Sequence, residues 1–375
     1  MELLIKKCEK IKNGYLIESE PNDIFYIDGK GGQLGDRGYI GDTQVLEVKE
    51  EGIVIDKELK CEKYEIQLDF SRRKDIACQH TAQHTFSAVA YNDYNLNTVG
   101  FRMAEEYTTV DLDSNEIKEE VISDLERKVN EIITKALKIK IFTMENEEAR
   151  KIEGLRKAIK DKVTGTVRFV EIPNVDLGAC AGFHVDNTKD IKLFKIINYE
   201  KIKGNYTRFY FIAGDRALKD YSYKHRLSKD LCHIFSCKDY EILDMLDKTL
   251  QEKKKVESEY KNLASQYVEL LAEKLLKESE ILHNYQPIFY FGDTTVASFL
   301  SRYMKENSIL VTGDNNSFSI TAQNFDCKEF IKYLTENHNN IKGGGSKNKG
   351  NFKGEIKESE LKNFLKNYLV SKQSN

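Results

Sequence analysis

The sequence predicts an α+β protein made of four consecutive parts, and three observations lead to that prediction. The chain has 375 residues, enough for two or three domains, and 40% of them are hydrophobic, enough for real cores. Residues 1–70 read as short strands and turns, whereas strands and helices are mixed along the rest. The predicted parts are a small N-terminal β-barrel (residues 1–70), an α+β core (71–214), a helical linker (215–286) and a C-terminal α/β domain (287–375).

The barrel is predicted from alternating apolar and polar residues. Gln44–Lys49 and Gly52–Asp56 alternate as half-buried strands do, and Ile24–Ile27 is a short apolar run. That run leads into Asp28–Gly38, which holds five glycines in eleven positions. This segment lacks the Lys-Ser/Thr ending of a P-loop and the helix context of a Rossmann turn. A plain turn and a backbone surface lining a site are both compatible with it.

The core is predicted to begin with a helix from Ser71 to about Asn92. Ser114 is expected to cap a second helix from Glu116 to Leu137, and a charged helix is predicted from Glu145 to Lys160. The strands predicted here are Tyr107–Asp113, Ile139–Thr143, Val167–Ile172, Leu193–Ile197 and Thr207–Ala213.

The linker is highly charged and contains no proline, which favours long helices. Apolar residues at 4-3-4-3 spacing predict the seam of a coiled coil or of a long hairpin: Val256, Tyr260, Leu263, Tyr267 and Leu270. The run is short, which favours a linker helix packed on a neighbour over a long fibre.

The C-terminal domain is predicted from alternating strands and helices that follow Pro287. Its expected elements are strands Ile288–Phe291, Ser308–Val311 and Phe318–Ala322, helices Thr294–Asn307, Lys328–Asn337 and Glu358–Val370, and a glycine-rich loop, Gly343–Gly354. Residues 342–375 carry eight lysines against three glutamates, so this part is the best nucleic-acid candidate of the chain. The lysines expected to bind are Lys342, Lys347, Lys349 and Lys353.

Composition excludes several classes of protein. The formal net charge is only −3, so the chain as a whole is not a basic nucleic-acid binder. Seven cysteines at scattered spacing suggest no disulfide framework. The N-terminus has no apolar stretch of signal-peptide length, and no window approaches ~20 apolar residues. The expectation is a soluble, cytoplasmic protein with reduced thiols.

Two short motifs carry the chemistry. His80-Thr-Ala-Gln-His84 and Cys180-Ala-Gly-Phe-His184 each place two metal-binding side chains four residues apart, on one helix face or in one tight turn. Three imidazoles and one thiolate form a good ligand set for one Zn²⁺, although each pair alone is compatible with ordinary packing. Thr81 stands where a metalloprotease motif has its glutamate, which excludes that class. Cys78 is either a further ligand or, more simply, a buried small residue.

These motifs resemble those of the alanyl-tRNA editing proteins, free-standing relatives of the editing domain of alanyl-tRNA synthetase. The resemblance covers nearly the whole chain and rests on five motifs in the family's order. They are Phe25–Gly38, His80–His84 with Arg72–Ile76 before it, Cys180–Val185 with Thr188–Ile196 after it, Arg208–Gly214, and Gly343–Gly354. The last motif is similar to the DHHA1-like C-terminal domain that alanyl-tRNA synthetases share with DHH-type phosphoesterases.

The resemblance implies hydrolysis of the ester that links a wrong amino acid to alanine tRNA, acting in trans on serine and possibly glycine. A pocket for alanine cannot exclude the smaller glycine and rejects an added hydroxyl poorly, so a second, hydrolytic site is needed. It also implies zinc held by His80, His84, Cys180 and His184, a pocket lined by Thr98, Gln33 and Asp36, and a homodimer through the C-terminal domain. Turn or strand chemistry explains Thr98, Gln33 and Asp36 equally well.

Three questions stay open at this point. Phe183 stands where the family usually has Thr, which bears on the amino-acid preference. Four protein ligands describe a closed structural site, whereas catalytic zinc normally keeps one position open. The alternative function is a non-catalytic module that binds zinc and tRNA; a phosphodiesterase is weak, since the sequence contains no Asp-His-His triplet.

Overall fold

The computed structural model describes residues 1–159, 164–314 and 316–372, and the chain divides into two compact units. Unit 1 comprises Met1–Asp230 and unit 2 comprises Leu231–Asn375. The finer division of the chain into four parts stays a prediction. Within the described ranges, no helix combines the length and the apolar character needed to cross a membrane.

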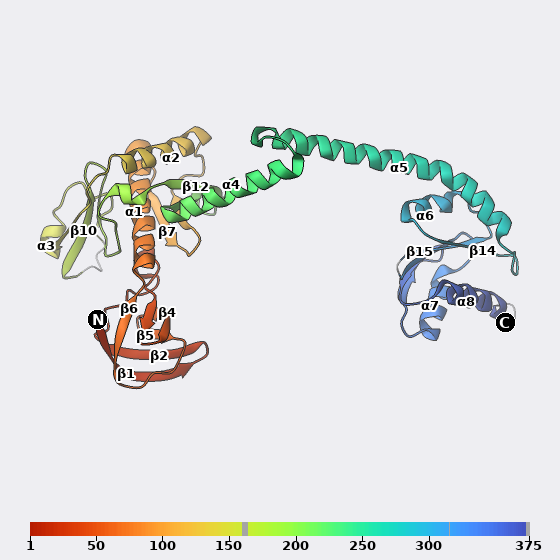
Figure 1. The fold of residues 1–375 in the computed structure, drawn as a ribbon, viewed down its shortest axis with the longest axis horizontal. Helices are drawn as coiled ribbons and strands as arrows, with labels where there is room; N and C mark the ends of the chain where they lie inside the picture. The colour runs from red at the N-terminus through yellow and green to blue at the C-terminus, as the bar shows by residue number, and fades with distance from the viewer. Residues whose placement is uncertain (160–163, 315, 373–375) are drawn as a thin grey trace. The chain divides into compact units, whose positions relative to one another are not determined.

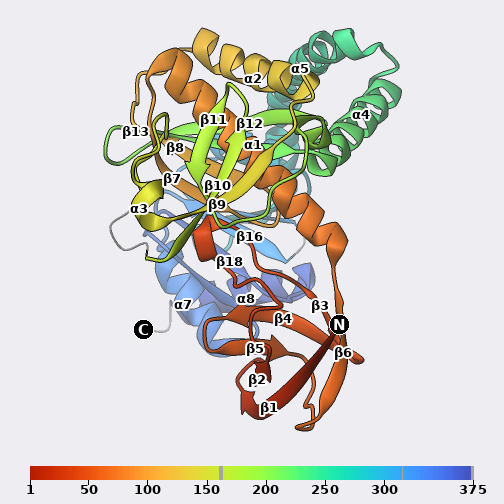
Figure 2. The ribbon, with the colours of Figure 1, turned by 90° about the vertical axis from the view of Figure 1, so that its left-hand side faces the viewer.

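Unit 1 begins with a closed six-stranded barrel, which confirms the predicted N-terminal barrel (Figure 2). Its strands follow the order β1-β2-β5-β4-β3-β6 around the barrel. They are β1 (Glu2–Ile11), β2 (Gly14–Glu20), β3 (Gly38–Ile40), β4 (Thr43–Lys49), β5 (Gly52–Ile55) and β6 (Lys63–Leu68). Apolar residues on alternate positions fill the interior, Leu3, Ile5, Ile17 and Val45 among them. The glycine segment leaves the barrel between β2 and β3 and contains one short turn of 3-10 helix, Lys30–Gly32.

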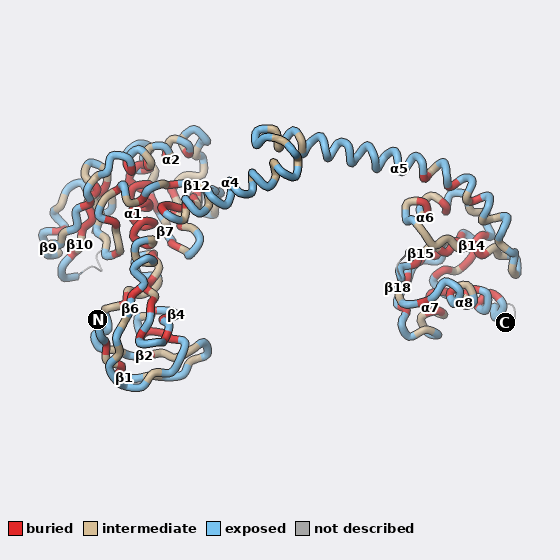
Figure 3. The backbone as a smooth tube through the Cα atoms, viewed as in Figure 1, coloured by how far each residue is buried: buried red, intermediate tan, exposed pale blue. Residues whose placement is uncertain are grey.

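The helix α1 (Phe70–Tyr94) follows the barrel, as predicted. The Asp69 side chain accepts a hydrogen bond from the backbone N–H of Arg72 at its start, and Asn95 ends it in the left-handed region. Every residue from Ile76 to Ala90 is buried, so this stretch is enclosed on all sides (Figure 3). A helix enclosed in this way holds its polar side chains in fixed positions.

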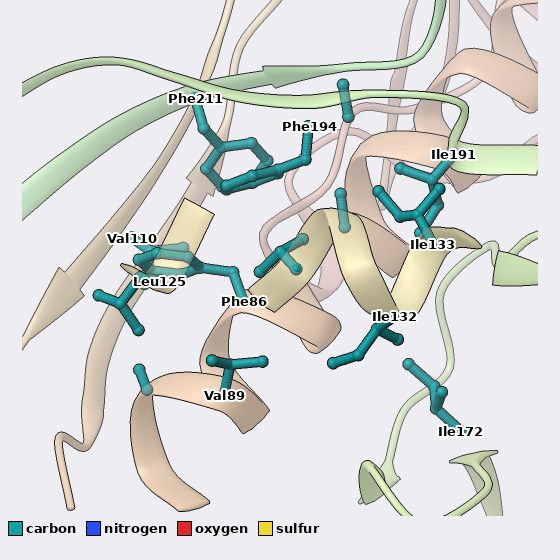
Figure 4. Close-up of a cluster of buried hydrophobic side chains, with 14 of the residues drawn as sticks. Phe86, Val89, Val110, Leu125, Ile132, Ile133, Ile172, Ile191, Phe194 and Phe211 are labelled. Carbon is teal, nitrogen blue, oxygen red and sulfur yellow. The ribbon is translucent and has the colours of Figure 1, made fainter. Parts of the chain in front are cut away.

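Two sheets and a second helix surround α1. The strand order is β12-β13-β8-β7 in one sheet and β11-β10-β9 in the other. The elements are β7 (Thr98–Met103), β8 (Thr108–Leu112), α2 (Glu119–Thr134), β9 (Lys140–Glu145), α3 (Asn146–Ala149), β10 (Thr166–Ile172), β11 (Asp176–Ala179), β12 (Phe194–Ile202) and β13 (Tyr206–Ala213). The core centres on Phe86 of α1, whose ring lies 5.7 Å from that of Phe194 and 6.2 Å from that of Phe211 (Figure 4).

Two predictions in unit 1 were wrong. The helix expected from Glu145 to Lys160 is only the single turn α3, because Gly154 has φ +81° and the chain up to Ile159 forms turns. Lys160 itself lies outside the described residues. Ser114 does not cap α2: its hydroxyl accepts from the N–H of Glu116, and the helix begins later, after Lys118.

Unit 2 contains a five-stranded sheet of order β14-β15-β16-β18-β17. In Figure 1, α7 and α8 lie on one side of this sheet, and α6 with the end of α5 lies on the other. The elements are α5 (Ile242–Glu278), β14 (Gln286–Phe291), α6 (Thr294–Leu300), β15 (Ser308–Asp314), β16 (Ser317–Ala322), α7 (Cys327–Asn337), β17 (Lys342–Gly345), β18 (Lys349–Lys353) and α8 (Glu358–Ser371). The helix α4 (Asp215–Phe235) spans the boundary between the units.

Three predictions in unit 2 were wrong. The seam from Val256 to Leu270 is exposed, and α5 instead packs on its own unit through Ala264, Val268 and Ala272. The helix expected to reach Asn307 ends at Leu300 as α6. The glycine-rich loop is a β-hairpin, β17–β18.

Close packing against α7 explains why this hairpin contains glycine at position 350. A Cβ added at Gly350 would lie 2.2 Å from Cδ1 of Ile331 on α7, so a side chain there is excluded by close packing.

Candidate metal centre

The structure brings the two predicted ligand pairs together. His80 and His84 lie one turn apart on α1, while Cys180 and His184 lie on the turn that follows β11. One ligand atom of each of the four residues lies within 4.8 Å of those of the other three. Cys78 is not part of this group: burial raises the pKa of its thiol to about 12, and its Sγ contacts the carbonyl oxygen of Ile191. Of the two roles predicted for Cys78, a buried small residue and a further metal ligand, the structure therefore supports the first.

The spacing of these atoms fits a tetrahedral zinc ion. The Sγ of Cys180 lies 3.6 Å from Nε2 of His80 and 3.3 Å from Nε2 of His184. Zinc bonds of about 2.3 Å to sulfur and about 2.0–2.1 Å to nitrogen, at a tetrahedral angle, place sulfur and nitrogen about 3.5 Å apart. The donor set and its dimensions therefore match one Zn²⁺.

Each of the three imidazoles is held through Nδ1, which leaves Nε2 toward the thiolate. Nδ1 of His80 lies 2.8 Å from Oε1 of Gln33, and Nδ1 of His84 lies 2.8 Å from Oδ2 of Asp176. Nδ1 of His184 lies 3.1 Å from the hydroxyl oxygen of Thr81, whose own proton goes to the carbonyl oxygen of Ala77. All three Nδ1 atoms therefore act as donors, and this tautomer presents the Nε2 lone pair to a metal.

Electrostatics keep the sulfur ionised. Burial opposes the charge of Cys180, but the contacts of its sulfur with the imidazoles of His184, His80 and His84 outweigh burial and lower the pKa of Cys180 to about 2. Burial lowers the pKa of His184 to about 3, so that ring is neutral. Burial also lowers the pKa of His80. Burial opposes the charge of His84 as well, but Asp176 and Cys180 outweigh it and raise the pKa of His84 to about 9. Metal binding therefore has to displace a proton from His84, because these residues bind metal as thiolate and neutral imidazole.

Two arginines support the turn that carries Cys180. Nη1 of Arg168 donates to the carbonyl oxygens of Cys180 and Gly182, at 2.6 and 2.9 Å. Nε of Arg156 donates to Asp176 at 2.7 Å. Gly182 is required by close approach, because an added Cβ would lie 2.3 Å from Cε1 of His80.

Gln33 links the glycine segment to both metal-binding motifs. Besides meeting His80, its Oε1 accepts the backbone N–H of Phe183 at 3.0 Å. The side chain is buried, and among the described residues its Nε2 has no hydrogen-bond partner. The structure thus brings Gln33 directly against a ligand, and one of its polar atoms is left available.

Asp36 is buried but fully engaged. Its oxygens accept from Nε of Arg73 at 2.8 Å, from Nη2 of Arg73 at 2.6 Å and from the backbone N–H of Tyr26 at 2.8 Å. The guanidinium of Arg73 lies over the ring of Phe183, 4.9 Å from its centre. Asp36 therefore acts on the site through Arg73 rather than through a free carboxylate.

Thr98, on β7, belongs to a chain of polar groups on the next turn of α1. Its hydroxyl lies 2.7 Å from that of Ser87, which accepts from Nε2 of Gln83 at 2.8 Å. All three residues are buried. Ser87 lies three residues beyond His84 and Gln83 just before it, so this network borders the ligand face of the helix.

Aromatic rings form the walls near the imidazoles. Phe101 of β7 stacks on His80, with ring centres 5.4 Å apart and planes 20° apart. Phe183 lies against Tyr26 at 4.9 Å. The departure at position 183 thus adds an aromatic ring, with Arg73 on it, beside the second metal-binding motif.

The predicted lysines all belong to unit 2. Lys342, Lys347, Lys349 and Lys353 are exposed, and none forms an ion pair within the described part of the chain. Nothing in their described surroundings neutralises them.

Sequence reasoning missed the residues that hold the ligands. Asp176 precedes Cys180 by four residues, and this spacing is only a weak indication that it lies near the metal ligands. Nothing in the sequence around Arg156 or Ser87 indicated such a position. Thr81 stood inside the first motif and was considered only as a missing glutamate. Contacts across 92 residues, as between His84 and Asp176, depend on the fold and not on spacing.

Comparisons with known proteins show sequences similar to this chain. Residues 167–210, which include Cys180 and His184, match the family described as threonyl and alanyl tRNA synthetase second additional domain. The chain is 30% identical over 236 residues to the alanyl-tRNA editing protein Aarsd1 of Bos taurus, covering 61% of this chain and 52% of that protein. It is 27% identical over 359 residues to the alanyl-tRNA editing protein AlaX-L of Pyrococcus horikoshii, covering 90% and 88%. The chain thus spans about half the length of the bovine relative.

Similarity between this chain and solved structures is weak. RecJ of Thermus thermophilus in complex with Mg²⁺ matches with a TM-score of 0.24 and 12% identity, over 36% of this chain and 21% of that chain. That score is too low to assign the fold of unit 2.

Proposed function

We propose that this chain, which belongs to the alanyl-tRNA editing protein family, is a zinc-dependent hydrolase that removes wrong amino acids from alanine tRNA. The reaction is cleavage of the ester between serine, and possibly glycine, and the terminal ribose. The observation that carries the proposal is the convergence of His80, His84, Cys180 and His184 with metal-like spacing and fixed tautomers. The work would be done in the cytoplasm, in trans.

The four ligands hold the metal, and their partners set its position. When bound, zinc supplies Lewis acidity close to the ester. Gln33, Asp176 and Thr81 orient the three imidazoles, and Arg168 fixes the Cys180 turn. Gln33 also presents a free amide N–H group at the edge of the ligand set, suited to donate to a substrate oxygen.

The chain offers no carboxylate base among the two buried aspartates beside the site. Asp36 is bound by Arg73 and the N–H of Tyr26, and Asp176 by His84 and Arg156. All four oxygens of these carboxylates already accept hydrogen bonds, and the pKa of Asp176 is lowered to about 2, which makes it a weak base. The residues therefore contribute positioning and electrostatics, and the rings of Phe101 and Phe183 form apolar walls beside the ligands.

We assign the amino-acid preference to the hydrogen-bond network of Thr98, Ser87 and Gln83. A serine hydroxyl can donate to the oxygen of Thr98, whereas alanine has no group to offer. Phe183 reduces the space beside Cys180, which favours small side chains. The tRNA itself is held by Lys342, Lys347, Lys349 and Lys353 through its phosphates, and removal of residues 284–375 should weaken tRNA binding and flatten its salt dependence. A homodimer through the C-terminal domain stays a prediction.

The test is a deacylation panel with Ser-, Gly- and Ala-tRNA(Ala) and the purified zinc-loaded protein. We expect fast release of serine and slow release of alanine. Binding of tRNA without release of any amino acid would assign the chain to the alternative, a non-catalytic module that binds zinc and tRNA. Omission of the protein, and the His84→Ala variant, serve as controls.

A further inference from the structure

One face of the sheet in unit 2 is only partly covered by helices. Strand register places Thr321, Ser319 and Ser317 of β16 opposite Lys349, Asn351 and Lys353 of β18. Directly opposite residues of an antiparallel pair project from the same face, and successive residues alternate. The other face carries Phe318, Ile320 and Phe352, which pack in the core with α7 and α8.

The helix α6 covers this face only at one end. Val296 and Leu300 of α6 pack on Ile288 and Leu310, which belong to β14 and β15. Beyond them, α6 forms the wall of a pocket of about 410 Å³, whose floor is β15, β16 and β18. That volume is within the range of sites for small organic ligands or single nucleotides, about 300–1,000 Å³.

The lining of this pocket is unusual for an acidic chain with 61 aspartates and glutamates. Seven of the side chains carry hydroxyls, one carries an amide and one an ammonium group, and among the described lining residues none carries a carboxylate. The polar residues are Thr294, Ser298, Ser301, Thr312, Ser317, Ser319, Thr321, Asn351 and Lys349. The carboxylate of Asp293, the residue next to Thr294, is bound to the backbone N–H groups of Thr295 and Val296.

Several of these polar groups are available to a ligand. Among the described residues, Thr312, Thr321 and Asn351 have no side-chain hydrogen bond, and Ser319 has only a long one, 3.4 Å, to the carbonyl oxygen of Gly350. Lys349 is exposed and forms no ion pair within the described ranges. A phosphate ester and its sugar are bound by hydroxyl and amide groups around one positive charge, in the absence of carboxylates that would repel the phosphate. The described lining of this pocket has these groups.

The described lining of the pocket lacks the features of two other kinds of site. Without a carboxylate it does not suit a metal cation. The only aromatic residue of this lining, Phe318, is buried in the opposite core, so the described residues offer no ring for base stacking. The lining therefore suits a phosphate ester and its sugar better than a metal ion or a stacked base.

We propose that the Thr312–Ser319–Asn351–Lys349 pocket of unit 2 binds a phosphate–ribose unit of the tRNA, as a formed site distinct from the general attraction of the C-terminal lysines. The identity of the RNA rests on the proposed function; the pocket and its preference for phosphate esters do not. Lys366 provides a matched control. It belongs to the same basic C-terminal part and is exposed, but it lies on α8, which packs on the other face of the sheet, and it does not line the pocket.

The experiment measures binding of uncharged alanine tRNA to the full chain by fluorescence anisotropy, at several NaCl concentrations. The variants are Lys349→Met, the double variant Thr312→Val/Ser319→Ala, and the control Lys366→Met. We expect dissociation constants about five- to twentyfold higher for the first two and less than about a twofold change for the control. Lys349→Met should also reduce the log–log salt slope by about 1, whereas the double variant should leave it unchanged because it removes no charge.

Two results would overturn the proposal that this pocket binds the phosphate–ribose unit. One is equal loss for Lys349→Met and Lys366→Met, which means that only overall charge matters. The other is wild-type affinity in the double variant, provided that its circular dichroism spectrum and melting temperature match the wild type.

Deacylation of a serine-loaded acceptor-stem minihelix separates this inference from the proposed function. If the wild type does not hydrolyse the minihelix while the pocket variants still lose tRNA binding, the proposed function fails and the pocket stands. If hydrolysis is normal and the variants bind tRNA as the wild type does, the pocket fails alone.

Discussion

His84 and Asp176, 92 residues apart in the chain, form a buried hydrogen bond of 2.8 Å between Nδ1 and Oδ2. Arg156 binds the other oxygen of Asp176 at 2.7 Å. Burial opposes the charge of this carboxyl, but the hydrogen bonds from His84 and Arg156 lower its pKa to about 2. A carboxylate behind a metal-binding imidazole fixes the ring and strengthens it as a ligand.

Asp176→Asn should therefore weaken zinc binding about 10–100-fold, the usual cost of losing such a partner. Competition with a chromogenic chelator measures the affinity. Asp111→Asn, which disturbs an Asp–Arg pair on the four-stranded sheet, is the matched control and should bind zinc as the wild type does. Unchanged zinc affinity in Asp176→Asn would show that the pair serves only the fold.

Replacement of a ligand should remove both metal and activity. We expect one zinc per wild-type chain by plasma emission spectrometry, and far less than one in His84→Ala and Cys180→Ala. Loss of the ion also leaves buried polar groups without their partner, so the melting temperature should fall. Cys78→Ala, a buried thiol outside the ligand group, is the control for loss of a cysteine. Full zinc content and full deacylation of Ser-tRNA in either ligand variant would exclude the assignment.

Thr98→Val tests how serine is selected. The substitution keeps the shape of the side chain and removes the oxygen that a serine hydroxyl would donate to. We expect kcat/KM for Ser-tRNA to fall about 3–10-fold, the value of one hydrogen bond, with no change for Gly-tRNA. Thr109→Val, on β8 of the same sheet, is the control. An equal loss of kcat/KM for both substrates would mean that Thr98 stabilises the structure of the pocket and does not distinguish serine from glycine.

Local patterns were sufficient for some parts of the structure. Apolar residues mixed with polar ones around Gln44–Lys49 and Gly52–Asp56 predicted strands of the barrel, and i, i+4 spacing predicted all four members of the ligand group. Both signals lie within a few residues, and both follow from the geometry of one element.

Other parts depend on tertiary contacts that spacing does not encode. In α5 the residues Val256–Leu270 and the set Ala264, Val268 and Ala272 both have helical periodicity, and only packing decided that the smaller residues are buried. The hairpin β17–β18 was mistaken for a loop because its glycines were interpreted as flexibility, whereas Gly350 is needed to approach Ile331. Apolar residues Ile152, Leu155 and Ile159 have helical spacing, yet they pack beside β9 and β10 from turns.

Asp28 connects the glycine segment to the barrel and gives a pH-dependent test of its stability. Its carboxylate forms an ion pair with Arg37 at 2.7 Å and accepts the backbone N–H groups of Gly35 and Val48, both at 2.9 Å. Burial acts against ionisation, but the hydrogen bonds from Arg37 and the two N–H groups prevail and hold the pKa of Asp28 below its usual value. Because the folded pKa is lower than the unfolded one, this group stabilises the fold above the unfolded pKa of about 3.9, and that contribution is lost as pH falls through the folded value.

Asp28→Asn should remove this contribution. At pH 7 we expect it to lower the free energy of unfolding by about 1–3 kcal/mol, the cost of breaking a half-buried network of this kind. Below the folded pKa the difference from the wild type should shrink, since both side chains are then neutral. The chain contains no tryptophan, so urea unfolding is best followed by circular dichroism at 222 nm between pH 2 and pH 7. Asp42→Asn, at an exposed position in the turn between β3 and β4, is the control and should change little at any pH. A difference between Asp28→Asn and wild type that stays constant across this range would place the effect in packing and not in the charge of Asp28.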